Sequence, residues 1–197
     1  MPISINGSGT VTGISVGGLP DGIVDADMLA ANAVTAGKLA SGVGGKFESY
    51  AIIADQKSAT TQGGSFTSGD WRTRDLNTEI ADADGIVSIS SNQFTLGAGS
   101  YMIRGYASVY RTNAHQVRLY NVTDSAEVAV GCNGMSHTSY YTMNPSVVTG
   151  RVTITGSTVF EFQHRCSTTQ TYNTYGFGQK ISWGTEQYAL VEIFKES

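Results

Sequence analysis

The chain has 197 residues, a formal net charge of −4 and only 14% charged residues, which is enough for one ordinary domain and a short extension. An acidic balance without any basic run argues against a nucleic-acid-binding surface. No apolar stretch approaches the ~20 residues that span a bilayer, and the first residues lack a signal-peptide pattern, so we expect no membrane insertion and synthesis in a cytoplasm.

The first 45 residues differ in composition from the rest. They contain 10 of the 24 glycines and no aromatic residue, whereas every Phe, Tyr and Trp lies at or after Phe47. Such a segment cannot bury enough apolar surface to form its own core. We therefore divide the chain into an N-terminal segment, 1–45, and a domain, 46–197.

Two parts of the N-terminal segment carry separate predictions. The runs Val24 to Ala30 and Val34 to Ala40 repeat one apolar pattern at a spacing of ten residues. Three copies could cover these sparse apolar positions on one axis, which favours a short trimeric stalk; the alternative is a Gly/Ala-rich linker. Upstream, apolar residues among Ser, Thr and Gly are predicted to order only against a partner and so to anchor the protein. These anchoring candidates are Ile3, Ile5, Val11, Ile14 and Val16.

From Tyr50 onward, short β-branched and aromatic runs alternate with turn residues such as Asp84-Gly85 and Gly156-Ser157. This pattern predicts an all-β domain, a jelly-roll β-sandwich, with no convincing helix. The predicted strands are 50–57, 86–90, 93–96, 101–111, 116–122, 127–132, 146–155, 158–166 and 187–195.

The first and last strands are apolar on both faces, unlike an ordinary strand with one solvated face. In the first strand Tyr50 and Ile52 oppose Ala51 and Ile53. If these strands pair, their second apolar face needs another subunit, which predicts a closed homo-oligomer. The interface candidates are Tyr50, Ile52, Tyr188, Leu190 and Phe194.

Strand directions predict which loops lie farthest from the N-terminal segment. If first and last strands pair, the loops 133–145 and 167–186 share the far tip. Their aromatic residues stand among Asn, Gln, Ser and Thr, a mixture that stacks on sugars or binds a protein partner. The receptor or glycan-binding candidates are Tyr140, Tyr141, Tyr172, Tyr175, Phe177 and Trp183. For Phe177 and Trp183 the alternative is that they plug the end of the sandwich.

Motifs for catalysis and for metals are weak. The run Gly13 to Gly17 matches G-x-S-x-G, but it lies in the core-less segment. His164 and Cys166 share one face of a predicted strand, yet no companion ligand pair follows. Cys132 and Cys166 form no disulfide framework, and we interpret both as packing residues. We therefore expect no enzyme activity, no cofactor and no metal.

Two sets of residues resemble a known family. Gly18 to Asp25, Leu29-Ala30 and Asn32 to Ala40 resemble the amino-terminal region of tailed-bacteriophage fibre and virion-appendage proteins. Asp55 to Lys57, Gly63 to Glu79, Asn92 to Leu96 and Gly99 to Tyr101 are similar to the head domain of such proteins, and Trp71 to Glu79 is the most specific run. That head is related to the trimeric jelly rolls of the complement globular head and the tumour-necrosis-factor group.

The resemblance implies a homotrimer and a role in a bacteriophage virion, made in the bacterial host cytoplasm. It implies phage capsid or tail proteins as partners, and a host cell-surface glycan or protein as a target. The stalk is short for a tail fibre, so the two placements are a receptor-binding knob on the tail and a decoration (cement or head-fibre) protein on the capsid. A free lectin-like binding module and a small jelly-roll hydrolase are the other hypotheses.

Overall fold

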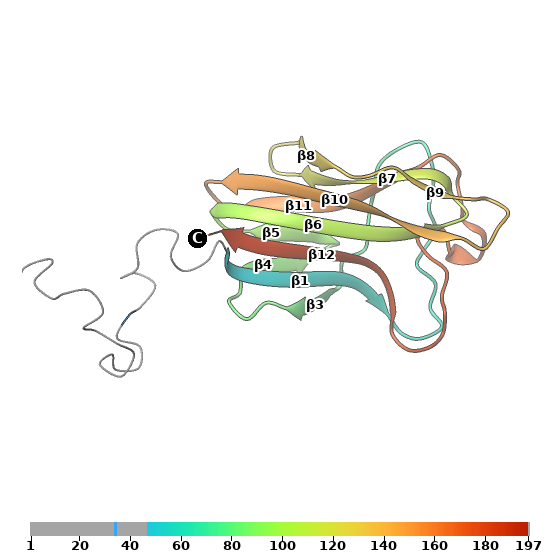
Figure 1. Cartoon of the computed structure of the whole chain (residues 1–197), viewed down its shortest axis with the longest axis horizontal. Helices are drawn as coiled ribbons and strands as arrows, with labels where there is room; N and C mark the ends of the chain where they lie inside the picture. The colour runs from blue at the N-terminus through green and yellow to red at the C-terminus, as the bar shows by residue number, and fades with distance from the viewer. Residues whose placement is uncertain (1–33, 35–46, 197) are drawn as a thin grey trace, which may run out of the picture. The chain divides into compact units, whose positions relative to one another are not determined.

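The structure is a computed structural model that describes residue 34 and residues 47–196. The domain boundary, the stalk and the anchoring candidates Ile3, Ile5, Val11, Ile14 and Val16 lie outside the described residues, so they stay predictions. Residues 47–196 form two antiparallel β-sheets packed face to face (Figure 1). The all-β sandwich expected from the sequence is confirmed. The described part of the chain contains no helix long and apolar enough to span a membrane.

The first sheet has five strands and contains both the first and the last strand of the chain. In spatial order its strands are β10 (Met143–Ile154), β6 (Gly99–Tyr110), β12 (Glu186–Glu196), β1 (Phe47–Lys57) and β3 (Thr78–Ala81).

The second sheet has seven strands, two of them short additions at the side of the main path. The path is β4 (Val87–Ser90), β5 (Gln93–Leu96), β11 (Thr158–Cys166), β7 (Asn113–Asn121) and β8 (Ala126–Val130). The additions are β2 (Arg72–Thr73), which pairs with β11, and β9 (Gly134–Ser136), which pairs with β7. A 3₁₀ turn, η3 (Tyr172–Thr174), follows β11.

The core lies between the sheets and follows the period-2 alternation of the strands. The first sheet contributes mainly aliphatic residues, and the second contributes the rings of Phe94, Phe160 and Phe162. Complete burial of such a side chain is worth about 1.5–3 kcal/mol. The aliphatic residues of the first sheet are Ala51, Ile53, Ile103, Ala107, Val148, Ala189, Val191 and Ile193.

The two ends of the sandwich differ in what they carry. β1 and β12 pair antiparallel with Phe47 opposite Glu196, so β1 begins and β12 ends at the same end, which we call the proximal end. The β6–β7 turn, the 137–142 loop and the 167–185 loop lie at the other, distal end. The predicted pairing of first and last strands and the predicted position of the two tip loops are both confirmed.

All nine predicted strands are present, with ends shifted by at most a few residues. Three short strands were not predicted: β2, β3 and β9. Two of these have only two or three residues, too few to show an alternation of polar and apolar side chains.

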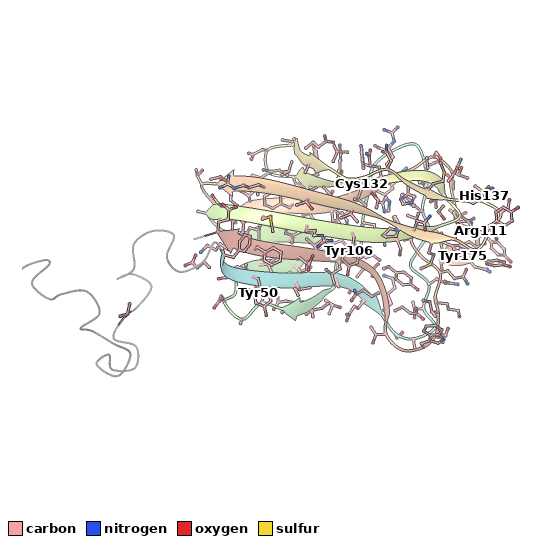
Figure 2. All side chains as sticks on the ribbon, viewed as in Figure 1. Tyr50, Tyr106, Arg111, Cys132, His137 and Tyr175 are labelled. Carbon is pink, nitrogen blue, oxygen red and sulfur yellow. The ribbon has the colours of Figure 1, made fainter. Side chains whose placement is uncertain are left out.

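The outer face of the first sheet exposes apolar side chains on both sides of a polar row that contains Arg104 and Glu192. Tyr50 is 55% exposed, and Phe47, next to it, is 39% exposed and packs against the ring of Phe194. Figure 2 shows Tyr50 and Tyr106 on this sheet. Half-buried apolar side chains extend the face across four strands. They are Ile52, Met102, Tyr106, Val147, Leu190 and Phe194.

Tyr188 does not belong to that face, contrary to the prediction. It is only 3% exposed, and its hydroxyl donates to the carbonyl of Thr61 at 2.6 Å. The 58–71 loop and the segment around Phe177 cover the start of β12, so Tyr188 is a packing residue of the single subunit.

Candidate functional site

The distal end presents three exposed tyrosines around one arginine. Tyr140, Tyr141 and Tyr172 are 67%, 85% and 67% exposed, and Arg111 lies among them on the β6–β7 turn. Figure 2 shows Arg111, His137 and Tyr175 gathered at this end. We call Arg111, Tyr140, Tyr141 and Tyr172 the tip patch.

Hydrogen bonds to the backbone hold the tip patch in place. Arg111 has a positive φ of 58°, and its amide donates to the hydroxyl of Ser136 at 2.9 Å. Ser136 is completely buried, and its hydroxyl donates in turn to the carbonyl of Thr142 at 2.8 Å. The guanidinium of Arg111 donates to the carbonyl of Ser139 at 2.9 Å. The β6–β7 turn and the 137–142 loop are therefore fixed together before any partner binds.

Aromatic contacts link Arg111 to the neighbouring tyrosines. The Arg111 guanidinium lies 5.2 Å from the ring centre of Tyr141 and 5.6 Å from that of Tyr110, which are cation–π distances. Tyr175 meets Tyr110 edge-on at 4.9 Å, and Tyr172 meets Tyr175 at 5.7 Å. Tyr110 and Tyr175 thus support Tyr141 and Tyr172 from below, and Tyr140 packs on the ring of His137 at 4.5 Å.

The distal end is positively charged although the whole chain is acidic. Within residues 47–196, four cationic side chains have no carboxylate within 4 Å: Arg72, Arg111, Arg165 and Lys180. All four lie at or near the distal end, where the loops 58–71, 131–142 and 167–185 contain a single acidic residue, Asp70. The pKa of Arg111 is raised, chiefly by its hydrogen bond with the Tyr175 side chain, which favours the charged form.

Two of the predicted binding residues are buried, which corrects the prediction for them. Tyr175 is 6% and Phe177 is 9% exposed. Phe177 packs against Phe66 with ring centres 4.4 Å apart, and the guanidinium of Arg74 lies 4.2 Å from its ring centre. Phe177 therefore plugs the end of the sandwich, which was the alternative expected from the sequence, and Tyr175 supports the tip patch from below.

Trp183 is fully accessible but belongs to a different part of the distal surface. It is 92% exposed and lies beside Ile181, which is 54% exposed, in a small pocket of about 150 Å³ next to the start of β12. The structure therefore brings the four predicted tyrosines together and leaves the tryptophan apart from them.

A buried arginine joins the distal loops to the sandwich. Arg74 is completely buried and donates to the carbonyls of Phe177 at 3.2 Å and Tyr188 at 3.0 Å. Asp55 lies 3.9 Å away, and Lys57 forms ion pairs with both Asp55 and Asp75 at 2.7 Å. Burial lowers the pKa of Arg74 to about 10, so it stays charged at neutral pH. This network has a structural role. It includes Arg74 and Asp75, so it accounts for two residues of the run Trp71 to Glu79, the most specific part of the sequence resemblance.

Two histidines meet in the interior near the distal end. Nδ1 of His115 and Nε2 of His164 are 3.0 Å apart, and Cys166 lies opposite His115 in the β7–β11 pairing. Burial lowers the pKa of His115 to about 4 and raises that of the Cys166 thiol to about 11. Within residues 47–196 no group of three or more His, Cys, Asp or Glu is placed to hold a metal ion. Cys166 is buried as predicted, whereas Cys132 is exposed, contrary to the prediction that it packs in the core.

Sequence reasoning missed Arg111, the centre of the tip patch. It was included at the end of a predicted strand, 101–111, and the strand in fact ends at Tyr110. The available signal was its position as the last residue of that predicted strand, at the same end of the sandwich as the aromatic loops. The contacts with Tyr110 and Tyr141 depend on a positive-φ turn that the residue types around it do not indicate.

No protein-family model matches the sequence, and no curated protein sequence matches it. Solved structures do match. A structure of murine APRIL at pH 5.0 has 8% identity and a TM-score of 0.48, over 75% of this chain and 98% of that one. The globular domain of zebrafish complement 1qA has 16% identity and a TM-score of 0.45, over 77% and 97%.

A third match is the Eiger TNF of S. frugiperda, with 8% identity and a TM-score of 0.48, over 78% of this chain and 94% of that one. The complement and tumour-necrosis-factor groups named in the sequence resemblance are therefore both represented among the matched structures. At these identities and scores no residue role passes from them to this chain. They also do not bear on the bacteriophage part of the resemblance.

Proposed function

We propose that this protein is a homotrimeric binding head of a bacteriophage virion, without enzyme activity, whose tip patch contacts a host-surface glycan or protein. The observation that carries the proposal is the set of exposed tyrosines around Arg111, at the end opposite to the point where the chain enters the head. Tyrosine offers a large contact area at low entropic cost, and arginine and tyrosine are enriched at binding hot spots.

The outer face of the first sheet supports the homotrimer. It exposes the rings of Tyr50 and Phe47 together with half-buried aliphatic side chains on four strands. Exposed aromatic and aliphatic surface of this kind is typical of a subunit interface. Arg104 and Glu192 form an ion pair at 3.8 Å within the face, which would supply polar contacts near the axis.

The virion placement rests on the N-terminal resemblance and on the polarity of the head. Segment 1–45 joins the domain at the proximal end, where β1 begins. A docked N-terminal segment would leave the distal end free to face outward. Tail and capsid placements share this geometry, and they differ in whether the tip patch has a ligand on the host.

A triple variant tests the role of the tip patch. Tyr140→Ser, Tyr141→Ser and Tyr172→Ser remove exposed rings, and Tyr175 stays because it supports Tyr110. Virions carrying the variant should adsorb to their host at least tenfold more slowly, while the purified trimer should melt within a few degrees of the parent, because these rings are solvent-exposed.

Ile80→Ser is the matched control, since Ile80 is 45% exposed on β3, away from the tip. Its adsorption should equal that of the parent. Normal adsorption by a well-folded triple variant would refute the receptor role and favour capsid decoration. The number of copies per particle in an image reconstruction would then distinguish the placements, with few trimers on a tail and many on a capsid.

A further inference from the structure

An open groove of about 720 Å³ with a mixed polar and apolar lining lies on the outer face of the second sheet near its distal end. This volume lies in the range of about 300–1,000 Å³ that is typical of small-molecule sites. None of the four tip-patch residues lines the groove. The lining residues that could contact a ligand through their side chains are Ser68, Ala114, Gln116, Asn133, Met135 and Arg165.

Arg165 and Gln116 form the floor of the groove. They are directly opposite each other in the β7–β11 pairing, so their side chains leave the sheet on the same face and lie side by side. Arg165 is exposed and has no carboxylate within 4 Å in residues 47–196; its one contact is a long hydrogen bond of 3.5 Å to the carbonyl of Gly69. A guanidinium is therefore available at the floor of the groove.

The carboxamides of Gln116 and Asn133 are already oriented by the protein. The Gln116 side-chain nitrogen donates to the carbonyl of Gly131 at 2.8 Å and to Oδ1 of Asn133 at 2.9 Å. These bonds leave the side-chain NH₂ of Asn133 as a donor and the side-chain oxygen of Gln116 as an acceptor. The groove therefore offers a fixed donor and a fixed acceptor next to the guanidinium.

Two glycines fix the wall that carries Asn133. A Cβ at Gly131 would lie 2.6 Å from Cγ2 of Val117, and a Cβ at Gly134 would overlap the ring of His115. The 131–134 segment can therefore approach β7 closely only because these positions have no side chain. Across the groove, the amide and hydroxyl of Ser68 are tied to the hydroxyl of Thr169 at 3.0 and 2.9 Å. Both walls are held by the fold.

Apolar surface completes the groove. Met135 is 57% exposed, and the methyl group of Ala114 points outward beside it on the neighbouring strand, since the two residues are paired. A ligand that uses the whole groove must carry an anionic group, hydroxyls that donate and accept, and a C–H face for Met135 and Ala114.

We infer that the groove binds an acidic saccharide, a sugar unit that carries a carboxylate. A planar carboxylate pairs with a guanidinium through two parallel hydrogen bonds, which a neutral sugar cannot do. One ring hydroxyl accepts a hydrogen bond from the side-chain NH₂ of Asn133, and another donates one to the side-chain oxygen of Gln116. The C–H face of the ring packs on Met135. This site is separate from the tip patch, so it stands or falls independently of the proposed host-binding role.

The test is direct binding to the purified full chain by titration calorimetry. The probe is digalacturonate, and its methyl ester is the matched neutral probe, because esterification removes the charge and adds only one methyl group to each carboxyl. We expect saturable binding of digalacturonate and at least tenfold weaker binding of the ester. Arg165→Gln should weaken digalacturonate binding at least tenfold, and Ala114→Trp should abolish it by filling the groove, because Ala114 is exposed and a β-strand accepts tryptophan.

Arg118→Gln is the control for general electrostatic attraction. Arg118 lies on the same sheet face but is paired with Glu127 at 3.3 Å, so its loss should change the affinity less than twofold. The proposal is wrong if digalacturonate does not bind, if acid and ester bind equally, or if Arg165→Gln and Arg118→Gln weaken binding alike. Competition by inorganic phosphate at the same concentration as digalacturonate would also overturn it, since the site would then recognise any anion.

Discussion

At the scale of single residues, the pairing of His115 with His164 makes the head sensitive to acid. The two rings share one hydrogen bond, and no carboxylate accompanies them. Burial, followed by the nearby charge of Arg74, lowers the pKa of both histidines, that of His115 to about 4. Both are therefore neutral in the folded head at neutral pH.

We predict that the free energy of unfolding falls when the pH is lowered from 7 to 5. Below the unfolded pKa of 6.5 the unfolded chain binds a proton on each histidine, while the folded head binds none until the pH approaches 4 for His115. The loss for His115 is about 1.4 kcal/mol per pH unit between 6.5 and 4. Urea unfolding at fixed protein concentration measures it.

Asp55 acts in the opposite direction, because burial raises its pKa and folding then favours its protonated form at low pH. The His115→Gln variant separates the two effects, since it keeps Asp55 and removes one histidine. Its unfolding free energy should depend less steeply on pH than that of the parent. Equal slopes in the two proteins would contradict the assignment.

At the scale of elements, the first sheet has two different faces. Its inner face is in the core, and its outer face exposes Tyr50 beside Phe47 and Phe194. The strands that form this face are adjacent, and its apolar side chains lie in two rows, Tyr50–Phe194–Met102 and Leu190–Tyr106–Val147. The polar pair Glu192–Arg104 separates the two rows. The proposed trimer would bury this surface.

Tyr50→Glu is predicted to convert the trimer to a monomer. Tyr50 is 55% exposed in the single subunit, so the substitution leaves the sandwich intact but places a charge in the proposed interface, where its desolvation is costly. Sedimentation at micromolar concentration gives the result. Ile80→Glu places a charge at an exposed position of β3, so this variant should sediment with the same molecular mass as the parent protein. A parent that sediments as a monomer would refute the homotrimer itself.

The sequence was most informative about the long strands, because each carries enough residues to show its alternation. It could not place residues whose burial depends on loops distant in the chain. Tyr188 is covered by Thr61, 127 residues earlier, and Phe177 by Arg74, 103 residues earlier. An aromatic residue among polar ones looks the same whether it plugs the end of a sandwich or faces solvent. The direction of the strands nevertheless placed Tyr140, Tyr141 and Tyr172 correctly at the distal end.

At the scale of the whole molecule, the head is polarised along its strands. Ion pairs lie at both ends, such as Arg151 with Glu196 at the proximal end and Lys57 with Asp55 at the distal end. Within residues 47–196, the cations without a carboxylate within 4 Å lie at or near the distal end. Under the proposed function, attachment and recognition are therefore assigned to opposite ends of one rigid sandwich.

A chain that begins at Lys46 is predicted to fold into the same trimeric head but to lose its association with virions. Residues 47–196 contain a hydrophobic core, which is why we expect them to fold without the first 45 residues. Because the first 45 residues contain no aromatic residue and are rich in Gly, we expect them to order against a partner and so to be the docking element. Sedimentation and co-purification with particles are the two measurements. Normal decoration of particles by the truncated head would contradict the docking assignment.

The two cysteines differ in solvent exposure, which gives the protein one position for chemical labelling. The sequence has two cysteines, and burial keeps Cys166 protonated, with its pKa raised to about 11 and its thiol bonded to the carbonyl of Thr168. Cys132 is exposed and directly precedes Asn133, which lines the groove, although Cys132 itself is not a lining residue. A maleimide dye added to the native protein would therefore react at Cys132, and its emission would report on changes beside the neighbouring Asn133 when a ligand binds.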